Sequence, residues 1–392
     1  MTWSNRERLT DEQKLIVSTV NQIMRKFGEN YWRSLDIARK YPDDFISEFE
    51  SAGLTALPVP EEYGGAGLGI REASLVLEEI NALGGNCQPF HGQYYLSFMI
   101  SRFASSKLKE QYLSSIAKGK LRMQTFALTE SEAGSESTRI KTFAEKKNGE
   151  YIVKGHKIYI SRMEQSDLMV LAARTTPYDS VEKKTDGISL FLVPLKDANG
   201  LRMQRINTMF NSETYEVFLD ELKIPEENRI GEEGKGFRIL LNVLNPERIL
   251  LASECIGDAR WFVKKSVEYS NARIVFGKPI GSNQGVQFPI ADVYAKLIAA
   301  EKVRWHAAEL YDGDADERTV GEYANISKYL AAECSWQAAN TAMDVFGGNG
   351  MAVDYDIERK FRETRLYRVA PISQNLVLAY IGHNILGLPR SY

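Results

Sequence analysis

Residues 127–136 read ALTESEAGSE and stand where the chain changes from a helical to a strand-like pattern. The hydroxyl groups and the glycine of this stretch would let a backbone approach a phosphate closely. A solvated loop has the same composition, so local chemistry alone leaves both interpretations open. The stretch marks the start of a β unit and a candidate site for a phosphorylated ligand.

The apolar pattern divides the chain into three parts. Before residue 124 apolar residues recur with the helical period, as in Ala73, Val76, Leu77 and Ile80. Between 124 and 235 short runs rich in β-branched and aromatic residues alternate with turn residues, at 151–153, 168–173, 188–193 and 215–219. The absence of intervening helical patterns favours an antiparallel sheet or barrel over a Rossmann unit.

Long helical patterns return after residue 235. One apolar stripe contains Val286, Ile290, Val293, Leu297 and Ala300, and a second contains Cys334, Ala338, Ala342 and Val345. The sequence therefore predicts a multi-domain α+β protein. Its expected parts are an all-α domain at 1–123, a central antiparallel β domain at 124–235 and a helix bundle at 236–392.

Composition excludes several classes of protein. The 49 basic residues nearly balance 52 acidic ones and are scattered, so no electrostatic footprint for nucleic acid is present. Three dispersed cysteines argue against a disulfide framework and fit a reducing compartment. No apolar run reaches the length of about 18 residues that a membrane span needs. The opening residues resemble no leader peptide, so we expect a cytoplasmic protein.

The stretch 127–136 as a whole resembles the ALTEPxAGSD signature of the acyl-CoA dehydrogenase family. Five more family signatures stand in the expected order: PEEYGGAG at 60–67, GHKIYIS at 155–161, IGEEGKGF at 230–237, RIVFGKPIGSNQ at 273–284 and DVFGGNGM at 344–351. The resemblance implies a helical domain, a central β-barrel and a C-terminal four-helix bundle. It also implies a homotetramer that holds FAD at a dimer interface.

The resemblance assigns several residues to the flavin end of FAD. Tyr159 falls where the family usually places a tryptophan against the flavin ring, and an aromatic side chain can still stack there. Ser161 falls where a hydroxyl donates to flavin N5. The residues expected at the isoalloxazine edge, partly through backbone groups, are Phe126, Leu128 and Thr129. Plain strand residues would show the same alternation of aromatic and hydroxyl side chains.

The remaining cofactor contacts are spread over the chain. Gly134 and Ser135 are expected at the phosphates, with Ser135 also expected to contact the substrate. Arg273, Phe276 and Gln284 match residues that reach the FAD of a neighbouring subunit, and an arginine suits a pyrophosphate because its donors fit phosphate oxygens in pairs. The expected set is completed by Asp344, Gly347, Gly348, Ser373 and Asn375. Asp344 replaces a frequent glutamine, and an acid would repel the pyrophosphate.

The catalytic base is not where many family members keep it. Desaturation of an acyl thioester needs a carboxylate to take the α proton, while the β hydrogen leaves as hydride. The usual C-terminal loop has Pro371 at the base position. Another branch of the family carries the base on the first long C-terminal helix, just before an arginine, where this chain has Glu247 and Arg248. We therefore expect Glu247 to be the base and Arg248 to hold the CoA portion.

A proline supports the assignment of Glu247, and one alternative interpretation stays open. Pro246 lies inside a helical pattern, so we expect a kink beside Glu247. An ordinary exposed Glu-Arg pair is the alternative interpretation of Glu247 and Arg248. The four histidines show no metal-binding spacing, and we expect no metal site.

The sequence favours an FAD-dependent acyl-CoA dehydrogenase that passes electrons to an electron-transfer flavoprotein. Two alternatives keep the fold. One is a flavoenzyme of another reaction, a desulfinase or a monooxygenase. The other is a non-catalytic FAD- or CoA-binding subunit of a hetero-oligomer. The acyl chain is not predicted. The candidates for the lining of its pocket are Phe90, Tyr94, Tyr95 and Phe98, but aromatic residues at this spacing more often belong to a core.

Overall fold

The computed structural model describes residues 9–196 and 198–390, which form two compact units. The strand unit contains Tyr41–Leu68 and Gln88–Leu244. The helical unit contains the described residues up to Lys40, Gly69–Cys87 and the described residues from Asn245 onward. The first eight residues, on which the expectation of no leader peptide partly rests, lie outside the described residues. The domain boundaries at 123/124 and 235/236 stay a prediction.

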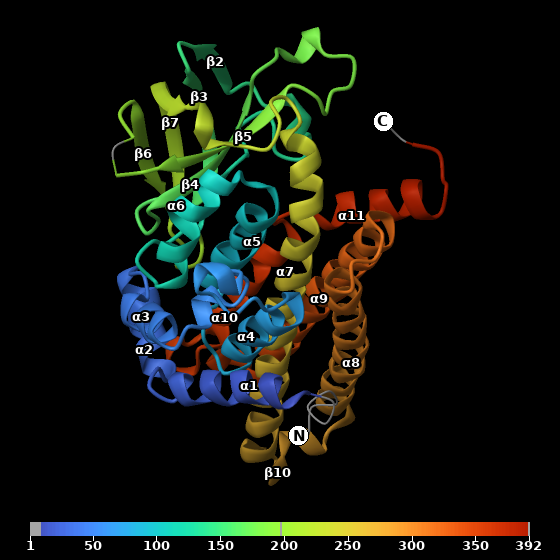
Figure 1. The fold of residues 1–392 in the computed structure, drawn as a ribbon. Helices are drawn as coiled ribbons and strands as arrows, with labels where there is room; N and C mark the ends of the chain where they lie inside the picture. Colours follow the sequence, from blue (N-terminus) through green and yellow to red (C-terminus); the bar gives the residue numbers. More distant parts are fainter. Residues whose placement is uncertain (1–8, 197, 391–392) are drawn as a thin grey trace. The chain divides into compact units, whose positions relative to one another are not determined.

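The strand unit is built on one sheet (Figure 1). Its strands run in the order β6-β7-β3-β2-β4-β5-β8, and β1 pairs with β4. Their bounds are Thr125–Ala127 for β1, Phe143–Lys147 for β2, Glu150–Ser161 for β3, Leu168–Arg174 for β4, Ile188–Pro194 for β5, Leu201–Ile206 for β6, Thr214–Pro225 for β7 and Arg229–Ile230 for β8. The four strands expected from the sequence all lie within this sheet.

The expectation of an antiparallel sheet holds for most of these pairs, but not for all. β1 pairs with β4 in parallel, with Phe126 opposite Val170, and β2 meets β4 in parallel at one position. β6 was not expected, because its side chains are largely exposed and polar, as in Arg202 and Gln204. The core of the sheet contains Tyr151, Val153, Leu171, Phe191 and Val217.

Among the described residues, three α-helices lie entirely in the strand unit: α3 (Asp43–Ser51), α5 (Gln88–Phe103) and α6 (Ser106–Ala117). Gly92 lets α5 approach the chain just before β1, because a Cβ there would lie 2.6 Å from the Gln124 carbonyl oxygen. The Phe90 ring packs against Phe49 of α3 at 4.7 Å between centroids. These contacts fix α5 beside the start of β1.

The helical unit contains α1 (Asp11–Met24), α2 (Glu29–Ala38), α4 (Ile70–Ala82), α8 (Gln284–Asp312), α9 (Glu317–Phe346), α10 (Ile357–Thr364), α11 (Gln374–Tyr380) and most of α7 (Gly236–Ala272). α8 and α9 lie side by side (Figure 1). The two expected stripes face the core: Ile290, Val293, Leu297 and Ala300 are buried on α8, and Cys334, Ala338 and Ala342 on α9. The expectation of long C-terminal helices is confirmed.

Buried charges also tie these helices together. Arg260 of α7 donates to Glu301 of α8 at 2.7 Å, and both Arg260 and Arg304 pair with Glu78 of α4. Because a buried charge is costly without a partner, each pair fixes one helix against another. These pairs therefore hold the part of α7 around Arg260 against α4 and α8.

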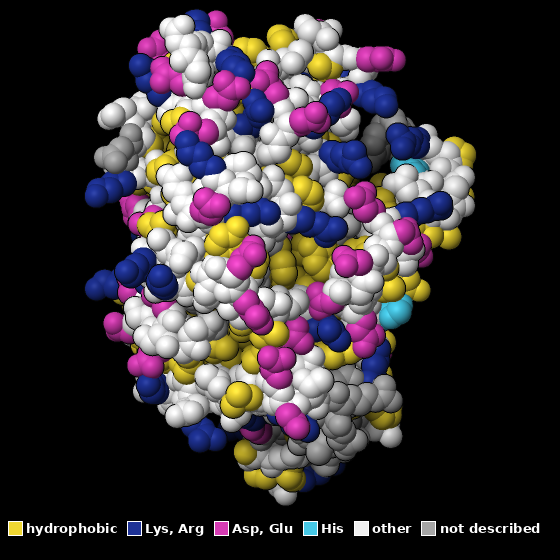
Figure 2. Space-filling model, viewed as in Figure 1, with side chains coloured by type: hydrophobic (Ala, Val, Ile, Leu, Met, Phe, Trp, Pro, Cys, Tyr) yellow, Lys and Arg dark blue, Asp and Glu magenta, His cyan; other side chains and the backbone are white. Residues whose placement is uncertain are grey.

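On the face drawn in Figure 2, acidic and basic side chains are interspersed. Within the described ranges 9–196 and 198–390, every helix is too short or too polar to cross a membrane.

Candidate functional site

The strand unit presents Tyr159 on a strained bulge of β3. The register of β3 against β7 shifts between Lys157 and Ile160, and Tyr159 takes a φ of +59°. Bulky residues rarely adopt positive φ, and such strain is found most often at functional sites. The bulge leaves the Tyr159 side chain 63% exposed. An exposed ring held in this way is available to stack on a flat ligand.

Ser161 lies at the end of β3, beside β1. The Thr125 hydroxyl, on β1, donates to the Ser161 carbonyl oxygen at 2.9 Å. The Ser161 hydroxyl itself makes no hydrogen bond within the part of the chain that the structure describes, and its residue is half-buried. It is therefore an available donor two residues after Tyr159 on β3.

The chain leaving β1 supplies the other predicted flavin contacts. Phe126 is half-buried, and its ring meets Tyr95 of α5 edge-on at 6.5 Å between centroids. Leu128 and Thr129 follow directly and are also half-buried. The structure thus brings these three residues to β1 and its exit, while Tyr159 and Ser161 lie on β3.

A buried ion pair joins β3 to the chain that leaves β1. Lys157 Nζ lies 2.9 Å from Glu130 Oε1, and the Lys157 side chain is fully buried. Burial lowers the pKa of Lys157 to about 8, although Glu130 acts in the opposite direction. Burial would raise the pKa of Glu130, but the charge of Lys157 and backbone donors hold that pKa below its usual value. Lys157 belongs to the GHKIYIS stretch, but no role was predicted for it. Its position in the inward-facing row of a strand was the available signal.

The loop that follows β1 contains Gly134 and Ser135, both exposed. A Cβ at Gly134 would meet no atom within 4 Å, and the backbone there does not have a positive φ. Neither packing nor backbone conformation within the chain therefore requires glycine at this position. Close approach of a ligand would explain it.

In the helical unit, α7 carries Glu247 and Arg248, each only 8% exposed. The alternative of an ordinary exposed pair is therefore wrong. Arg248 donates to Asn245 Oδ1 at 3.0 Å, and its Nε has no acceptor among the described residues. Burial lowers the pKa of Arg248, while Glu247 and Tyr380 act to raise it.

α7 continues as one helix through Pro246. The expected kink beside Glu247 stays a prediction. α9 comes close to this turn of α7 at Gly321. A Cβ at Gly321 would lie 3.2 Å from the Tyr380 hydroxyl and 3.8 Å from the Asn245 amide. Asn245 and Tyr380 were missed by the sequence analysis, and the small residue opposite them gives no recognisable signal in one sequence.

The loop before α11 contains Pro371 and Ser373, and Asn375 lies in the first turn of α11. The Ser373 hydroxyl accepts from the Leu376 N–H at 3.3 Å and caps α11. Lys328 of α9 donates to the Ile372 carbonyl oxygen at 2.7 Å and so holds the loop. Asn375 is exposed. Ser373 thus has a structural role beside its expected contact with the cofactor.

The residues expected at a neighbouring subunit's FAD are exposed on the helical unit. Arg273 and Gln284 flank the hairpin of β9 (Ile274–Val275) and β10 (Lys278–Pro279), and Phe276 at its tip is 99% exposed. Tyr269 of α7 stacks on Phe346 at 4.1 Å between centroids, just before Gly347.

The end of α9 supplies the glycines of the expected cofactor set. Gly347 has a φ of +57°, and a Cβ at Gly347 or Gly348 would meet nothing within 4 Å. Asp344, one turn earlier, is exposed. The Tyr269–Phe346 stack therefore places this turn at the same end of the helical unit as Arg273.

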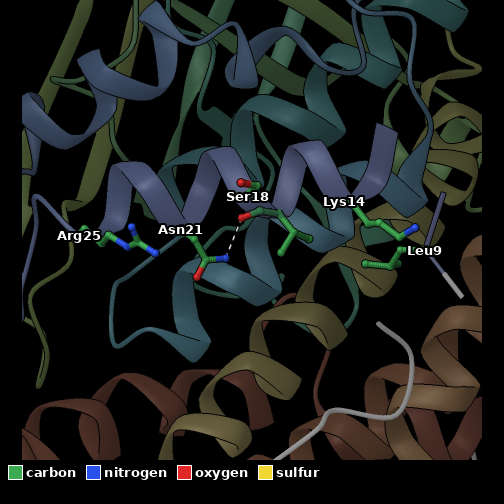
Figure 3. A pocket seen from close by; sticks show the side chains of 6 residues that line it. Leu9, Lys14, Ser18, Asn21 and Arg25 are labelled. Atoms are coloured by element: carbon green, nitrogen blue, oxygen red, sulfur yellow. Dashed lines mark hydrogen bonds between the residues drawn. The ribbon is translucent and has the colours of Figure 1, made fainter. Parts of the chain in front are cut away.

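A hollow of about 350 Å³ lies on one face of α1 (Figure 3). Its lining consists of Leu9, Lys14, Val17, Ser18, Asn21 and Arg25. Lys14 already pairs with Asp11, and Asn21 donates to the Val17 carbonyl oxygen and to Glu79. None of the predicted site residues lines this hollow.

Three family models match the chain in order. They describe the acyl-CoA dehydrogenase N-terminal domain at residues 10–120, the middle domain at 125–222 and the C-terminal domain at 234–376. Acyl-CoA dehydrogenase FadE12 of Mycobacterium tuberculosis is 35% identical over 390 residues, which cover 98% of each chain.

Two solved structures are similar over the same length. Butyryl-CoA dehydrogenase from Megasphaera elsdenii matches with a TM-score of 0.90 and 26% identity over 98% of this chain and all of that one. A structure reported for the electron transferring flavoprotein of Acidaminococcus fermentans matches with a TM-score of 0.91 and 29% identity, also over 98% and 100% of the two chains. The chain therefore belongs to the acyl-CoA dehydrogenase family and is an oxidoreductase that acts on acyl-CoA.

Proposed function

We propose that this protein is an FAD-dependent acyl-CoA dehydrogenase that introduces an α,β double bond into an acyl-CoA thioester, with Glu247 as base. The burial of Glu247 on α7 carries the proposal, because the loop that often supplies the base has Pro371 instead. Burying a carboxylate is costly, and use in catalysis explains its presence on this helix.

The residues of the chain fit FAD. An exposed ring at Tyr159, an available hydroxyl at Ser161 and open space around Gly134 suit a flat ring system joined to phosphates. Arg273 adds an exposed guanidinium, and the open Gly347-Gly348 turn allows close backbone approach. When bound, FAD would supply an acceptor for the hydride.

The protein's own groups handle the proton. The Cα–H bond of the acyl group breaks, its proton moves to a carboxylate oxygen of Glu247, and its electron pair forms the new C=C bond. The β hydrogen leaves with its own electron pair for the cofactor, so charge and electrons balance. Arg248 is adjacent to Glu247 on α7, where burial lowers the pKa of the arginine and the charge of Glu247 acts to raise it.

Assembly and electron transfer complete the proposal. Apolar side chains are exposed near the hairpin, at Ile274, Phe276, Phe288 and Met351, and an interface with further copies of the chain in a homotetramer would cover them. An electron-transfer flavoprotein would reoxidise the cofactor. A cytoplasmic location stays a prediction, with which the three dispersed cysteines are compatible.

Anaerobic titration with straight, branched and cyclic acyl-CoAs tests the proposal. The purified protein should be yellow, and at least one acyl-CoA should bleach the flavin. Glu247→Gln should abolish rapid bleaching but keep the flavin, whereas the control Glu268→Gln, on an exposed part of α7, should behave like the native protein. Unchanged bleaching by Glu247→Gln would overturn the assignment of the base, and a folded but colourless protein would favour the non-catalytic subunit.

A further inference from the structure

Lys157 occupies a position that a strand normally gives to an apolar residue. On β3 the residues Tyr151 and Val153 face the core, and Lys157 continues the same alternating row. Its side chain is fully buried, although lysine is almost never fully buried unless it is paired. The bulge interrupts this alternation, and Ile160 is the next β3 residue that packs in the core. The chain thus places a cation in its core two residues before the strained Tyr159.

The partner of this cation is held from several sides. Glu130 Oε1 accepts from Lys157 Nζ and from the Thr142 N–H, each at 2.9 Å, and Oε2 accepts from the Lys141 N–H at 2.6 Å. Gly155 makes room for this arrangement, since a Cβ there would lie 2.3 Å from the Thr142 hydroxyl. Glu130 is thus held by three hydrogen-bond donors, and the lack of a side chain at Gly155 allows Thr142 to approach.

Lys157 makes a second contact, which points toward the flavin residues. Its Nζ donates to the Leu128 carbonyl oxygen at 2.9 Å, and the next strand residue, Ile158, donates its N–H to the Thr129 carbonyl oxygen at 3.0 Å. Both links join β3, which carries Tyr159 and Ser161, to the chain that leaves β1. One side chain and one amide therefore fix the two groups of predicted flavin contacts to each other.

The direction of one amide follows from this contact. In a trans peptide the C=O and the following N–H point in opposite directions. Since the Leu128 carbonyl points at the buried Lys157, the Thr129 N–H of the same peptide group points away from the core. That N–H donates to no atom of residues 9–196 and 198–390, and Thr129 is half-buried. A half-buried donor held in a fixed direction is suited to an acceptor on a ligand.

We propose that Lys157 is a positioning residue for the flavin: by holding the Leu128 carbonyl it aims the Thr129 N–H at an oxygen or nitrogen on the isoalloxazine edge. This inference rests on the proposed function, because it requires FAD. It goes beyond that function in assigning a role to a residue that does not contact FAD. A donor fixed at this edge would stabilise the negative charge that reduction places on the ring, and would so raise the flavin potential.

The test compares Lys157→Met with Lys154→Met in the full-length protein. Lys154 lies on the same strand but is exposed and pairs with Glu221, so it is a matched control. For Lys157→Met, titration of the FAD-free protein should show a Kd for FAD that is about tenfold higher, the equivalent of about 1.4 kcal/mol. The flavin potential should shift to more negative values. Lys154→Met should change neither quantity.

Glu130→Gln/Lys157→Met keeps the test valid if the single variant fails to fold, because it removes the buried carboxylate together with its cation. This double variant should show the same weaker FAD binding and the same shift of potential. A native Kd and potential in a folded variant without Lys157 would overturn the inference, as would equal losses in Lys154→Met. If the native protein binds no FAD, the proposed function itself fails, and these readouts separate that result from the others.

Discussion

Two buried pairs of opposite charge, one in each unit, differ in how their charges meet. In the strand unit, the oxygens of Glu130 accept from one side chain and two backbone amides, and Lys157 also donates to a carbonyl. In the helical unit, Glu247 and Arg248 are neighbours on one helix, where adjacent side chains do not face each other. Arg248 forms no ion pair with any described residue.

The difference distinguishes a pair that supports the structure, Glu130 with Lys157, from a pair that we propose takes part in the reaction, Glu247 with Arg248. A carboxylate with three strong donors is held in its ionised form and has little capacity left for a proton, so Glu130 suits a fixed support. Glu247 is buried to a similar degree, but its cationic neighbour Arg248 acts through the field and not through a direct contact. Arg248 therefore does not hold Glu247 through an ion pair in the way that Lys157 holds Glu130. The comparison therefore predicts different consequences for substitutions in the two pairs.

Glu247→Gln should produce the largest effect. Loss of a general base costs about 10²–10⁴-fold in rate, so flavin reduction by an acyl-CoA should slow by that factor while FAD stays bound. Glu130→Gln should show the reverse pattern, with weaker FAD binding and lower stability but a reduction rate within about tenfold of the native rate. Stopped-flow reduction and thermal unfolding measure the two properties. Similar rate losses in both variants would remove the distinction between the pairs.

The pH dependence of stability should identify the buried lysine. The pKa of Lys157 falls from its usual 10.5 to about 8 in the folded protein, so between these values the unfolded chain binds more protons. The contribution of this group to the free energy of unfolding therefore increases as pH rises from about 8 to 10.5. The slope of that increase is about 1.4 kcal/mol per pH unit.

The lowered pKa of Lys328 also makes the free energy of unfolding rise with pH, whereas the raised pKa values of the buried cysteines make it fall. Measurements on the native protein alone therefore cannot isolate the contribution of Lys157. The measurement is the difference in unfolding free energy between native protein and Lys157→Met at about pH 7.5 and at about pH 9.5 in urea. That difference should move in favour of the native protein at the higher pH. A constant difference would show that Lys157 has the same pKa in both states.

Asn245→Ala should have a moderate effect on substrate binding. Asn245 accepts from Arg248 and lies opposite Gly321, so its loss leaves a buried guanidinium with one acceptor fewer. A hydrogen bond to a charged group contributes about 1.5–3 kcal/mol, and part of that loss should appear as a higher KM for acyl-CoA. The kcat should change less than KM. A large fall in kcat with an unchanged KM would instead mean that Arg248 acts mainly on Glu247.

The sequence predicted the fold well because its signals are periodic. The apolar stripes of α8 and α9 and the runs of β4 and β5 follow directly from spacing. The site was less accessible, since the pairing of Lys157 with Glu130 joins residues 27 apart, and one sequence does not reveal that the chain after β1 lies against β3. The exposed strand β6 gave no periodic apolar signal at all.

Helix α5 also contains residues whose surroundings could not be predicted from the sequence, and one of them leads to the last prediction. Four of its aromatic residues were candidates for the acyl pocket, although their spacing is more typical of a core, and the structure distinguishes Tyr95 from Phe90 and Tyr94. Phe90 and Tyr94 are fully buried, with the Tyr94 hydroxyl donating to the Leu54 carbonyl oxygen at 2.6 Å. Tyr95 lies on another face, 5.4 Å from the His91 ring and 6.5 Å from the Phe126 ring between centroids. Tyr95 is thus the candidate that lies next to an expected flavin contact.

Tyr95→Ala should therefore change the choice of acyl chain by a small factor. If its ring limits the acyl pocket, removing it should raise kcat/KM for longer acyl-CoAs relative to shorter ones by about tenfold, since each methylene contributes about 1–3 kcal/mol. Tyr94→Phe is the control, because it removes a structural hydroxyl and should lower stability without changing the ratio. Equal kcat/KM ratios in Tyr95→Ala and the native protein would place the end of the acyl pocket elsewhere and leave Tyr95 as packing for Phe126.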